Sequence, residues 1–244
     1  HTKISLGFFN RLDGFSKGKY ASLNCSITSG DDVQNIKKNI NKVKKKMSLD
    51  NTKLKIINQI HSNKVVTINN NNLNKNIKAD AMITQNKNIS IAILTADCCP
   101  IFLSDNEASF ISCIHSGWKG CYSNIVKNTL FEINKIKNNN IQINAIIGPC
   151  LGQKNFEVTE SFVEKFLKSN SDFNKYFINS KNGNFLFDMR GVIKYQLLNE
   201  GLINIEDVNF DTYANKEIFY SYRRSTHEED NPTGRMINII GFTS

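Results

Sequence analysis

The 244-residue chain has little of what reactive sites are usually built from: it holds one tryptophan, four histidines and three prolines. It has no apolar run long enough for a membrane helix and no secretory signal pattern, so we expect a cytoplasmic protein with no membrane partner. The six cysteines include no Cys-x-x-Cys pair and no regular spacing. They are therefore expected to be free thiols or metal ligands in a reducing compartment.

Arginine is also scarce, although the formal net charge is +9 and lysine is abundant. The lysines are spread through Asn- and Ile-rich segments without interleaved aromatic residues, which predicts a solvated surface and no nucleic-acid partner. A basic balance still favours small anions such as phosphate. The planar fork of arginine cannot be reproduced by lysine, so the five arginines are candidates for specific roles. They are Arg11, Arg190, Arg223, Arg224 and Arg235.

Hydrophobic periodicity predicts strands and helices along the whole chain. Strands are expected at 4–9, 54–60, 64–68, 89–94, 100–104, 109–114, 141–148 and 236–242. Helices are expected at 29–47, 121–137, 189–201 and from 161 through 167. The first should start near Ser29 or Asp31, and Gly201 should cap the 189–201 helix. The strands come in blocks, without a linker or repeat, so we predict a single α+β domain over residues 1–244.

The segment TADCCPIFLSDNEASFISCIHSGWKG (95–120) concentrates the scarce residue types. It reads as two apolar strands joined by a turn. A hairpin centred on Asn106–Glu107 places Cys98 directly opposite His115 and points Cys99 to the other face of the sheet. The register therefore selects Cys98 as the partner of His115.

A thiol beside an imidazole has two chemical interpretations. In one, the imidazole lowers the pKa of the thiol and makes it a nucleophile. In the other, both side chains bind a zinc ion, which needs a third ligand. His61 lies between two predicted strands and suits that position, whereas His227 lies in a polar segment typical of a solvated loop. We leave His1 out of the site argument.

Each candidate also has an ordinary structural interpretation. Cys98 can be a small core residue, and His115 a hydrogen-bonded residue of the hairpin. Asp97 can orient a ligand or shuttle a proton, but it can equally shape the turn. Trp118 can stack on a base or belong to the core. The residues alone leave these alternatives open.

Seven stretches, in order along nearly the whole chain, carry a family resemblance. They are FFNRLDGFSKGKYASLN (8–24), NQIHSNKV (58–65), TADCCPIFL (95–103), CIHSGWKG (113–120), IGPCLGQKNFEV (147–158), FDMRGVIKYQL (187–197) and YSYRR…TGRM (220–236). Together they resemble the YfiH-like family of laccase-domain proteins, also called multicopper polyphenol oxidases. The chain departs from the family pattern at Ser62, Asp13–Gly14 and STHEEDNP (225–232), which leaves the substrate preference open.

The resemblance implies a layered α/β/β/α architecture, similar to the catalytic domain of cytotoxic necrotizing factor. It implies phosphorolysis of purine nucleosides such as inosine, adenosine, guanosine or methylthioadenosine, together with adenosine deaminase activity. The partners would be a purine nucleoside and phosphate. The resemblance also implies that His61, Cys98 and His115 bind one zinc ion with a fourth position open, copper being the less favoured metal.

For this reaction we predict five catalytic residues: Cys98, His115, Asp97, Arg11 and Arg224. The two arginines are candidates to hold the phosphate. Two other functions stay open. A copper-dependent polyphenol oxidase needs several copper ions and many histidines, and only three remain without His1. A Cys–His amide hydrolase acting on cell-wall precursors needs a thiolate that is free of metal. The sequence does not determine the oligomeric state.

Overall fold

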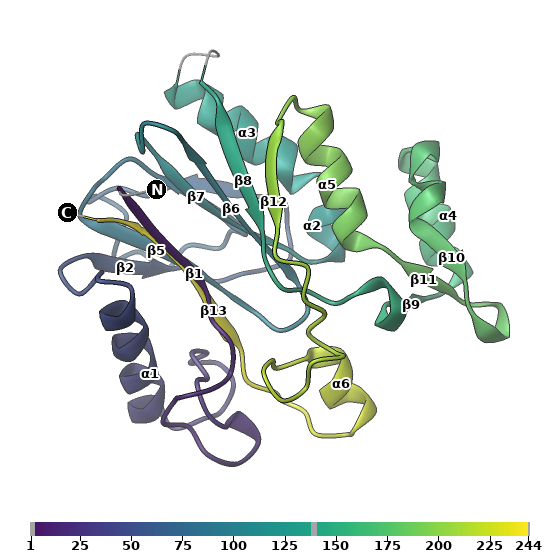
Figure 1. Cartoon of the computed structure of the whole chain (residues 1–244), viewed down its shortest axis with the longest axis horizontal. Helices are drawn as coiled ribbons and strands as arrows, with labels where there is room; N and C mark the ends of the chain where they lie inside the picture. Colours follow the sequence, from purple (N-terminus) through teal and green to yellow (C-terminus); the bar gives the residue numbers. More distant parts are fainter. Residues whose placement is uncertain (1–2, 138–140, 244) are drawn as a thin grey trace.

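Two β-sheets pack face to face at the centre of the molecule (Figure 1). The computed structural model describes residues 3–137 and 141–243, so His1 lies outside the described residues. The smaller sheet has the order β1-β13-β5-β2, with β1 at Ile4–Phe8, β13 at Met236–Phe242, β5 at Ile89–Thr95 and β2 at Lys53–Ile56.

The larger sheet has six strands in the order β12-β8-β6-β7-β4-β3. These are β12 (Asn204–Asp207), β8 (Ile143–Ile147), β6 (Cys99–Asp105), β7 (Ile111–Ser116), β4 (Ala81–Thr84) and β3 (Val65–Thr67). A small third sheet, β10-β11-β9, stands beside it and comprises β9 (Glu157–Val158), β10 (Phe177–Asn179) and β11 (Phe185–Phe187).

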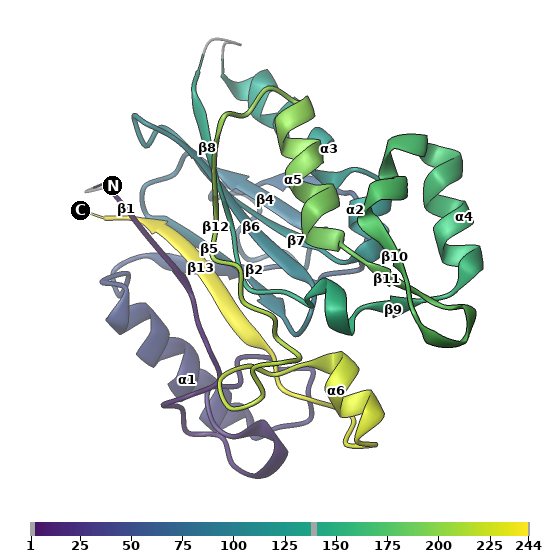
Figure 2. The ribbon, with the colours of Figure 1, turned by 45° about the vertical axis from the view of Figure 1, so that its right-hand side comes forward.

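Helices cover the outer faces of the two main sheets (Figure 2). The helices of the described residues are α1 (Val33–Lys46), α2 (Trp118–Tyr122), α3 (Ile125–Ile136), α4 (Glu160–Ser169), α5 (Met189–Asn199) and α6 (Tyr222–His227). Helix α1 packs on the smaller sheet, and α2, α3 and α5 pack on the larger one. Short 3-10 turns lie at Gly18–Tyr20, Gln153–Asn155, Ser171–Tyr176 and Lys181–Gly183.

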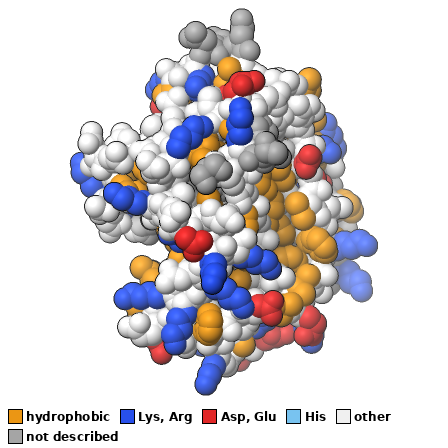
Figure 3. All heavy atoms as spheres, turned by 60° about the vertical axis from the view of Figure 1, so that its left-hand side comes forward, with side chains coloured by type: hydrophobic (Ala, Val, Ile, Leu, Met, Phe, Trp, Pro, Cys, Tyr) orange, Lys and Arg blue, Asp and Glu red, His pale blue; other side chains and the backbone are white. Residues whose placement is uncertain are grey.

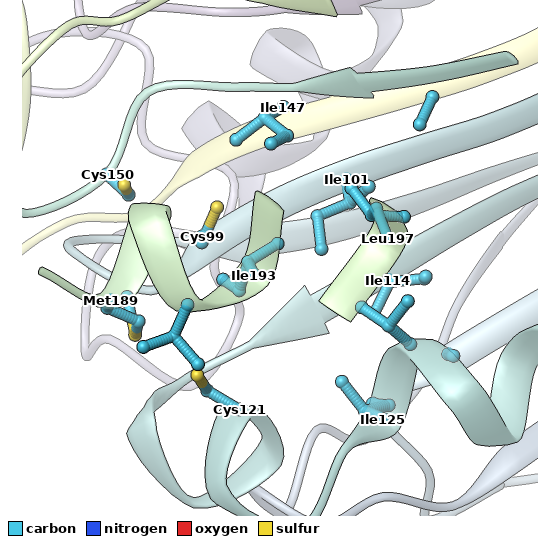
Figure 4. Close-up of a cluster of buried hydrophobic side chains, with 14 of the residues drawn as sticks. Cys99, Ile101, Ile114, Cys121, Ile125, Ile147, Cys150, Met189, Ile193 and Leu197 are labelled. Atoms are coloured by element: carbon cyan, nitrogen blue, oxygen red, sulfur yellow. The ribbon is translucent and has the colours of Figure 1, made fainter. Parts of the chain in front are cut away.

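The four layers are α1, the smaller sheet, the larger sheet, and α2 with α3 and α5. Alternating side chains of the central strands fill the three interfaces between them. On β5, Ile91 and Ile93 pack between the two sheets, whereas Ala92 packs on the α1 side with Val43. Side chains of the larger sheet that point outward pack against α5, as Ile101 does (Figure 4). Period-two alternation with both faces buried confirms the predicted α/β/β/α layering.

Most of the predicted elements are present, and the differences lie mainly at turns and ends. The first helix is capped by Asp32, whose carboxylate accepts from the Gln34 amide (2.7 Å), rather than by Ser29 or Asp31. The helix expected at 121–137 is interrupted at Asn124, which adopts a left-handed conformation and caps α3. Glu200 is the C-cap of α5, and Gly201 follows it with the left-handed φ of 85° that is typical of a glycine at a helix end.

The predicted hairpin register is wrong by two residues. Pro100, and not Cys98, lies opposite His115, and Cys98 precedes β6 by one residue. The turn is longer than expected, because the Asp105 carboxylate accepts hydrogen bonds from both the amide and the hydroxyl of Ser109. A shift of two residues preserves the face that each side chain occupies. Cys99 accordingly lies in the helix-side core, as Figure 4 shows.

The surface and the cysteines agree with the compositional analysis. All six cysteines are unpaired thiols. On the face shown in Figure 3, Lys and Arg side chains are scattered, with Asp and Glu among them, instead of forming one basic patch. No helix within the described residues is both long and apolar enough to cross a membrane.

Candidate metal centre and its cavity

Three potential metal ligands from distant parts of the chain meet at one end of the larger sheet. His61 comes from the loop between β2 and β3, Cys98 directly precedes β6, and His115 lies on β7. Their ligand atoms all lie within 4.8 Å of one another. The Cys98 sulfur is 3.7 Å from Nε2 of His61, and the two imidazole rings meet edge to face with centroids 4.9 Å apart. His115 is buried whereas His61 is exposed, so the cluster opens to solvent on one side.

Asp80 holds two of these ligands in place and was missed by the sequence analysis. Its carboxylate is fully buried and accepts a hydrogen bond from Nδ1 of His115 (2.9 Å). It also accepts from the amides of Ile60 (3.1 Å), His61 (2.9 Å) and Ser62 (2.6 Å), and from the Ser62 hydroxyl (2.7 Å). Burial would raise the pKa of Asp80, but the hydrogen bonds from His115 and Ser62 outweigh it and lower the pKa. Because Nδ1 carries the shared proton, Nε2 of His115 is left as the ligand atom.

The surroundings of Cys98 lower the pKa of its thiol and favour the thiolate. Burial would raise its pKa, but the charge of His115 and hydrogen bonds from His115 and His61 lower it to about 6. Burial would lower the pKa of His115, but Cys98 and Asp80 raise it to about 9. The Cys98 thiolate is therefore available at neutral pH, either as a metal ligand or as a nucleophile.

Tight backbone geometry brings the ligands this close. A Cβ at Gly117 would lie 2.9 Å from Cδ2 of His61 and 3.0 Å from the Cys98 sulfur, so only glycine fits between them. His61 and Asp97 both have positive φ angles, of 55° and 91°. Non-glycine residues seldom adopt this conformation, and such strain clusters at functional sites.

The donor set suits a zinc ion. Zinc binds thiolate at about 2.3 Å and imidazole at about 2.0–2.1 Å, which puts neighbouring ligand atoms of a tetrahedral site roughly 3.5 Å apart. The 3.7 Å between Cys98 and His61 is close to that value. Three protein ligands and an open side are typical of catalytic rather than structural zinc sites.

The cluster forms part of the wall of a cavity of about 940 Å³. Apolar side chains line one portion, and they are Trp118, Leu151, Phe156 and Met189. Polar and charged residues line another, including Ser26, Asn58, Gln59, Arg223 and Arg235. Mixed linings of this size are typical of small-molecule sites. Trp118 contributes to the wall while its ring packs on Phe162 with centroids 5.2 Å apart.

The carboxylate of Asp97 is engaged by a neighbouring segment of the chain. It is buried and accepts from the Thr212 hydroxyl (2.6 Å), the Ser221 hydroxyl (3.0 Å) and the Arg223 amide (2.6 Å). Burial raises its pKa. Asp97 thus ties the Cys98 segment to the start of α6.

The structure does not bring Arg11 and Arg224 to the cavity. Arg11 donates from Nε to the carbonyl of Ala21 (2.8 Å) and stacks over the ring of Tyr220. Arg224 is buried and donates to main-chain carbonyls, among them that of Tyr213 (2.8 Å). Main-chain acceptors therefore occupy both guanidinium groups, whereas Arg223 and Arg235 line the cavity.

The fold and the site define a class: a four-layer α/β/β/α protein with a His–Cys–His cluster beside a large cavity. The chain belongs to the family described as multi-copper polyphenol oxidoreductase laccase, whose model matches residues 5–243. This confirms the resemblance derived from the sequence.

Similar proteins cover almost the entire chain. A purine nucleoside phosphorylase of Rickettsia prowazekii is 30% identical over 232 residues, which are 93% of this chain and 91% of the relative. One from Haemophilus influenzae is 30% identical over 236 residues, 95% of this chain and 91% of the relative. The crystal structure of Bacillus licheniformis YfiH matches with a TM-score of 0.90 at 25% identity, covering 98% of this chain and 93% of that one. A Neisseria meningitidis protein matches with a TM-score of 0.87 at 25% identity, covering 99% and 95%.

Proposed function

We propose that this protein is a metal-dependent purine nucleoside phosphorylase that also deaminates adenosine. The observation that carries the proposal is the His61–Cys98–His115 cluster in the wall of a cavity large enough for a nucleoside and phosphate. Relatives named purine nucleoside phosphorylase, 30% identical over more than nine-tenths of the chain, support the same reaction.

Phosphorolysis exchanges one bond at the sugar for another. A phosphate oxygen forms a bond to C1′ as the bond from C1′ to the purine nitrogen breaks. The electron pair of that bond leaves with the purine, which takes up a proton on a ring nitrogen. The products are a free base and ribose-1-phosphate. In the deamination of adenosine, water adds at the amine-bearing carbon of the purine and ammonia leaves.

The residues of the chain divide these tasks. His61, Cys98 and His115 would hold zinc, which when bound supplies Lewis acidity and lowers the pKa of water to about 7. Phe156 and Leu151 belong to the apolar wall of the cavity. This wall would pack against a flat purine ring and exclude water from it. The hydrogen bond from His115 to Asp80 keeps the imidazole in one orientation throughout.

Two other functions are less well supported. Multicopper oxidation needs several ions, and one cluster of three potential ligands is found within the described residues. A Cys–His amide hydrolase would use the lowered pKa of Cys98 for nucleophilic attack. Metal content distinguishes the hydrolase from the metal-dependent phosphorylase, because a thiolate bound to zinc is not a free nucleophile.

Metal analysis combined with product identification tests the proposal. The purified protein should contain about one zinc ion per chain. With phosphate, it should convert inosine to hypoxanthine and ribose-1-phosphate, and it should release ammonia from adenosine. Full activity after removal of the metal by a chelator would exclude metal dependence. Ammonia from adenosine without any phosphorolysis would leave only the deaminase part.

A further inference from the structure

Two arginines in the cavity wall have no acidic partner among the described residues. Arg235 donates from Nη1 to the carbonyls of Thr233 (2.9 Å) and Gly234 (3.0 Å). Arg223 donates from Nη1 to the carbonyl of Glu157 (3.1 Å). None of the ion pairs within 3–137 and 141–243 involves either arginine. Because a guanidinium has five N–H donors, each side chain keeps Nε and Nη2 without an acceptor in the described part of the chain.

The rest of the chain fixes both arginines beside the metal cluster. The amide of Arg223 donates to Asp97 (2.6 Å), the residue that precedes Cys98. The amide of Arg235 donates to the side-chain oxygen of the fully buried Asn24 (3.0 Å). Burial lowers the pKa of Arg235, and the charges of Cys98 and Asp97 oppose this shift. Hydrogen bonds thus anchor the main chain at both arginines, and the Nη1 bonds to carbonyls hold each guanidinium group.

We propose that Arg223 and Arg235 form the phosphate subsite of this cavity, an inference that rests on the proposed phosphorylase function. A half-buried guanidinium loses hydration, and an anion bound to its unpaired N–H groups offsets the part of that loss that the carbonyl acceptors leave. The planar fork of arginine matches two oxygens of phosphate, and two forks hold a tetrahedral dianion in one orientation. The aromatic rings beside them, Phe156 under Arg223 (5.5 Å) and Tyr222 near Arg235 (5.9 Å), restrict where the guanidinium groups lie.

Conservative variants test the subsite in the intact, metal-loaded protein. Arg223→Lys and Arg235→Lys keep the charge and remove the fork. We expect the KM for phosphate to rise about tenfold or more, with the KM for inosine within about twofold. Calorimetric titration of inorganic phosphate should show the same loss of affinity without nucleoside. Arg190→Lys is the matched control, because Arg190 pairs with Asp207 outside this cavity.

Labelling of the wild-type protein keeps the test valid if the variants fold poorly. Phenylglyoxal modifies accessible arginines, and mass spectrometry maps the modified positions. Inorganic phosphate should protect Arg223 and Arg235, while protection confined to other arginines would overturn the proposal.

The possible failures are distinguishable. If the wild type phosphorolyses inosine but Arg223→Lys and Arg235→Lys keep the wild-type KM for phosphate, the subsite is wrong and the function stands. The subsite is also wrong if Arg11→Lys or Arg224→Lys raises that KM instead. If the wild type cleaves no nucleoside yet binds phosphate through Arg223 and Arg235, the proposed function fails and the subsite stands.

Discussion

At the scale of single residues, the site depends on a buried carboxylate as much as on its three potential ligands. Asp80 accepts five hydrogen bonds from four residues, and these fix both the His61 loop and the His115 ring. These hydrogen bonds to Asp80 hold the two histidines in position and leave a ring nitrogen of each available for a metal ion. The acid therefore preorganises two of the three proposed ligands, His61 through its main chain and His115 through its ring.

Replacing Asp80 by asparagine tests this role. In Asp80→Asn the amide group has one acceptor oxygen in place of two, so an N–H donor is left facing other donors. We expect zinc affinity to fall about 10- to 100-fold, measured by competition with a chelator. The unfolding free energy should fall by roughly 1–3 kcal/mol. The exposed Asp50→Asn serves as control, and zinc affinity within twofold of wild type in Asp80→Asn would contradict the account.

The two adjacent cysteines should respond differently to substitution. Cys98→Ala removes a proposed zinc ligand, so bound zinc and nucleoside cleavage should both be lost. Cys99→Ala should retain both and lose about 1 kcal/mol of stability, because Cys99 packs in the core between the larger sheet and its helices. Metal content, activity and chemical unfolding distinguish the pair. If both variants fold and lose zinc equally, then Cys98 and Cys99 do not lie on opposite faces of the sheet.

At the scale of elements, the N-terminus of helix α6 connects Arg223 to the segment that carries Cys98. Helix α6 has six residues, and Ser221 is its N-cap. The Ser221 hydroxyl accepts from the Arg224 amide (3.1 Å) and donates to Asp97 (3.0 Å). One side chain therefore connects the helix that carries Arg223 to the segment that carries Cys98.

Removing this cap should affect both stability and phosphate binding. We expect Ser221→Ala to lower the unfolding free energy by about 1 kcal/mol and to raise the KM for phosphate. Ser221→Thr keeps the hydroxyl and should restore most of both losses. If Ser221→Ala lowers stability but leaves the KM for phosphate unchanged, the cap is structural only.

Continuous apolar runs predicted the central strands β5, β6 and β13, which are buried on both faces. Strand β12 was missed since it is polar (NIED) and lies at an edge. Strand β4 (AMIT) was also missed, although all four of its residues are buried. The hairpin register was wrong because Asp105 stabilises a longer turn than simple counting allows. Period-two geometry kept the correct face in spite of that error.

At the scale of the whole molecule, the site joins segments that only the tertiary fold brings together. Ser221 and Asp97 are separated by 124 positions in sequence. The family motifs pointed to His61, Cys98 and His115 as a group, and the structure brings them together. No local pattern marks the partners of Asp80, or shows that Arg223 faces the cavity while Arg224 binds carbonyls. These contacts depend on packing between distant elements.

The layered core should make the fold independent of the metal. The two sheets share an apolar interface, in which each fully buried Ile contributes roughly 1.5–3 kcal/mol. We therefore expect the chelator-treated protein to remain folded, by circular dichroism, with activity lost. Zinc should raise the unfolding temperature in a concentration-dependent way, because it binds the folded chain preferentially. Complete unfolding on metal removal would mean that the cluster is structural.

The most direct test of the central claim follows the oxygen atoms of phosphate. The zinc-loaded protein is incubated with inosine and ¹⁸O-labelled phosphate, and the products are analysed by mass spectrometry. Formation of the new bond at C1′ by a phosphate oxygen predicts ribose-1-phosphate that retains the full label, in equal amount with hypoxanthine. Free ribose carrying oxygen from water, or cleavage that proceeds equally without phosphate, would contradict phosphorolysis.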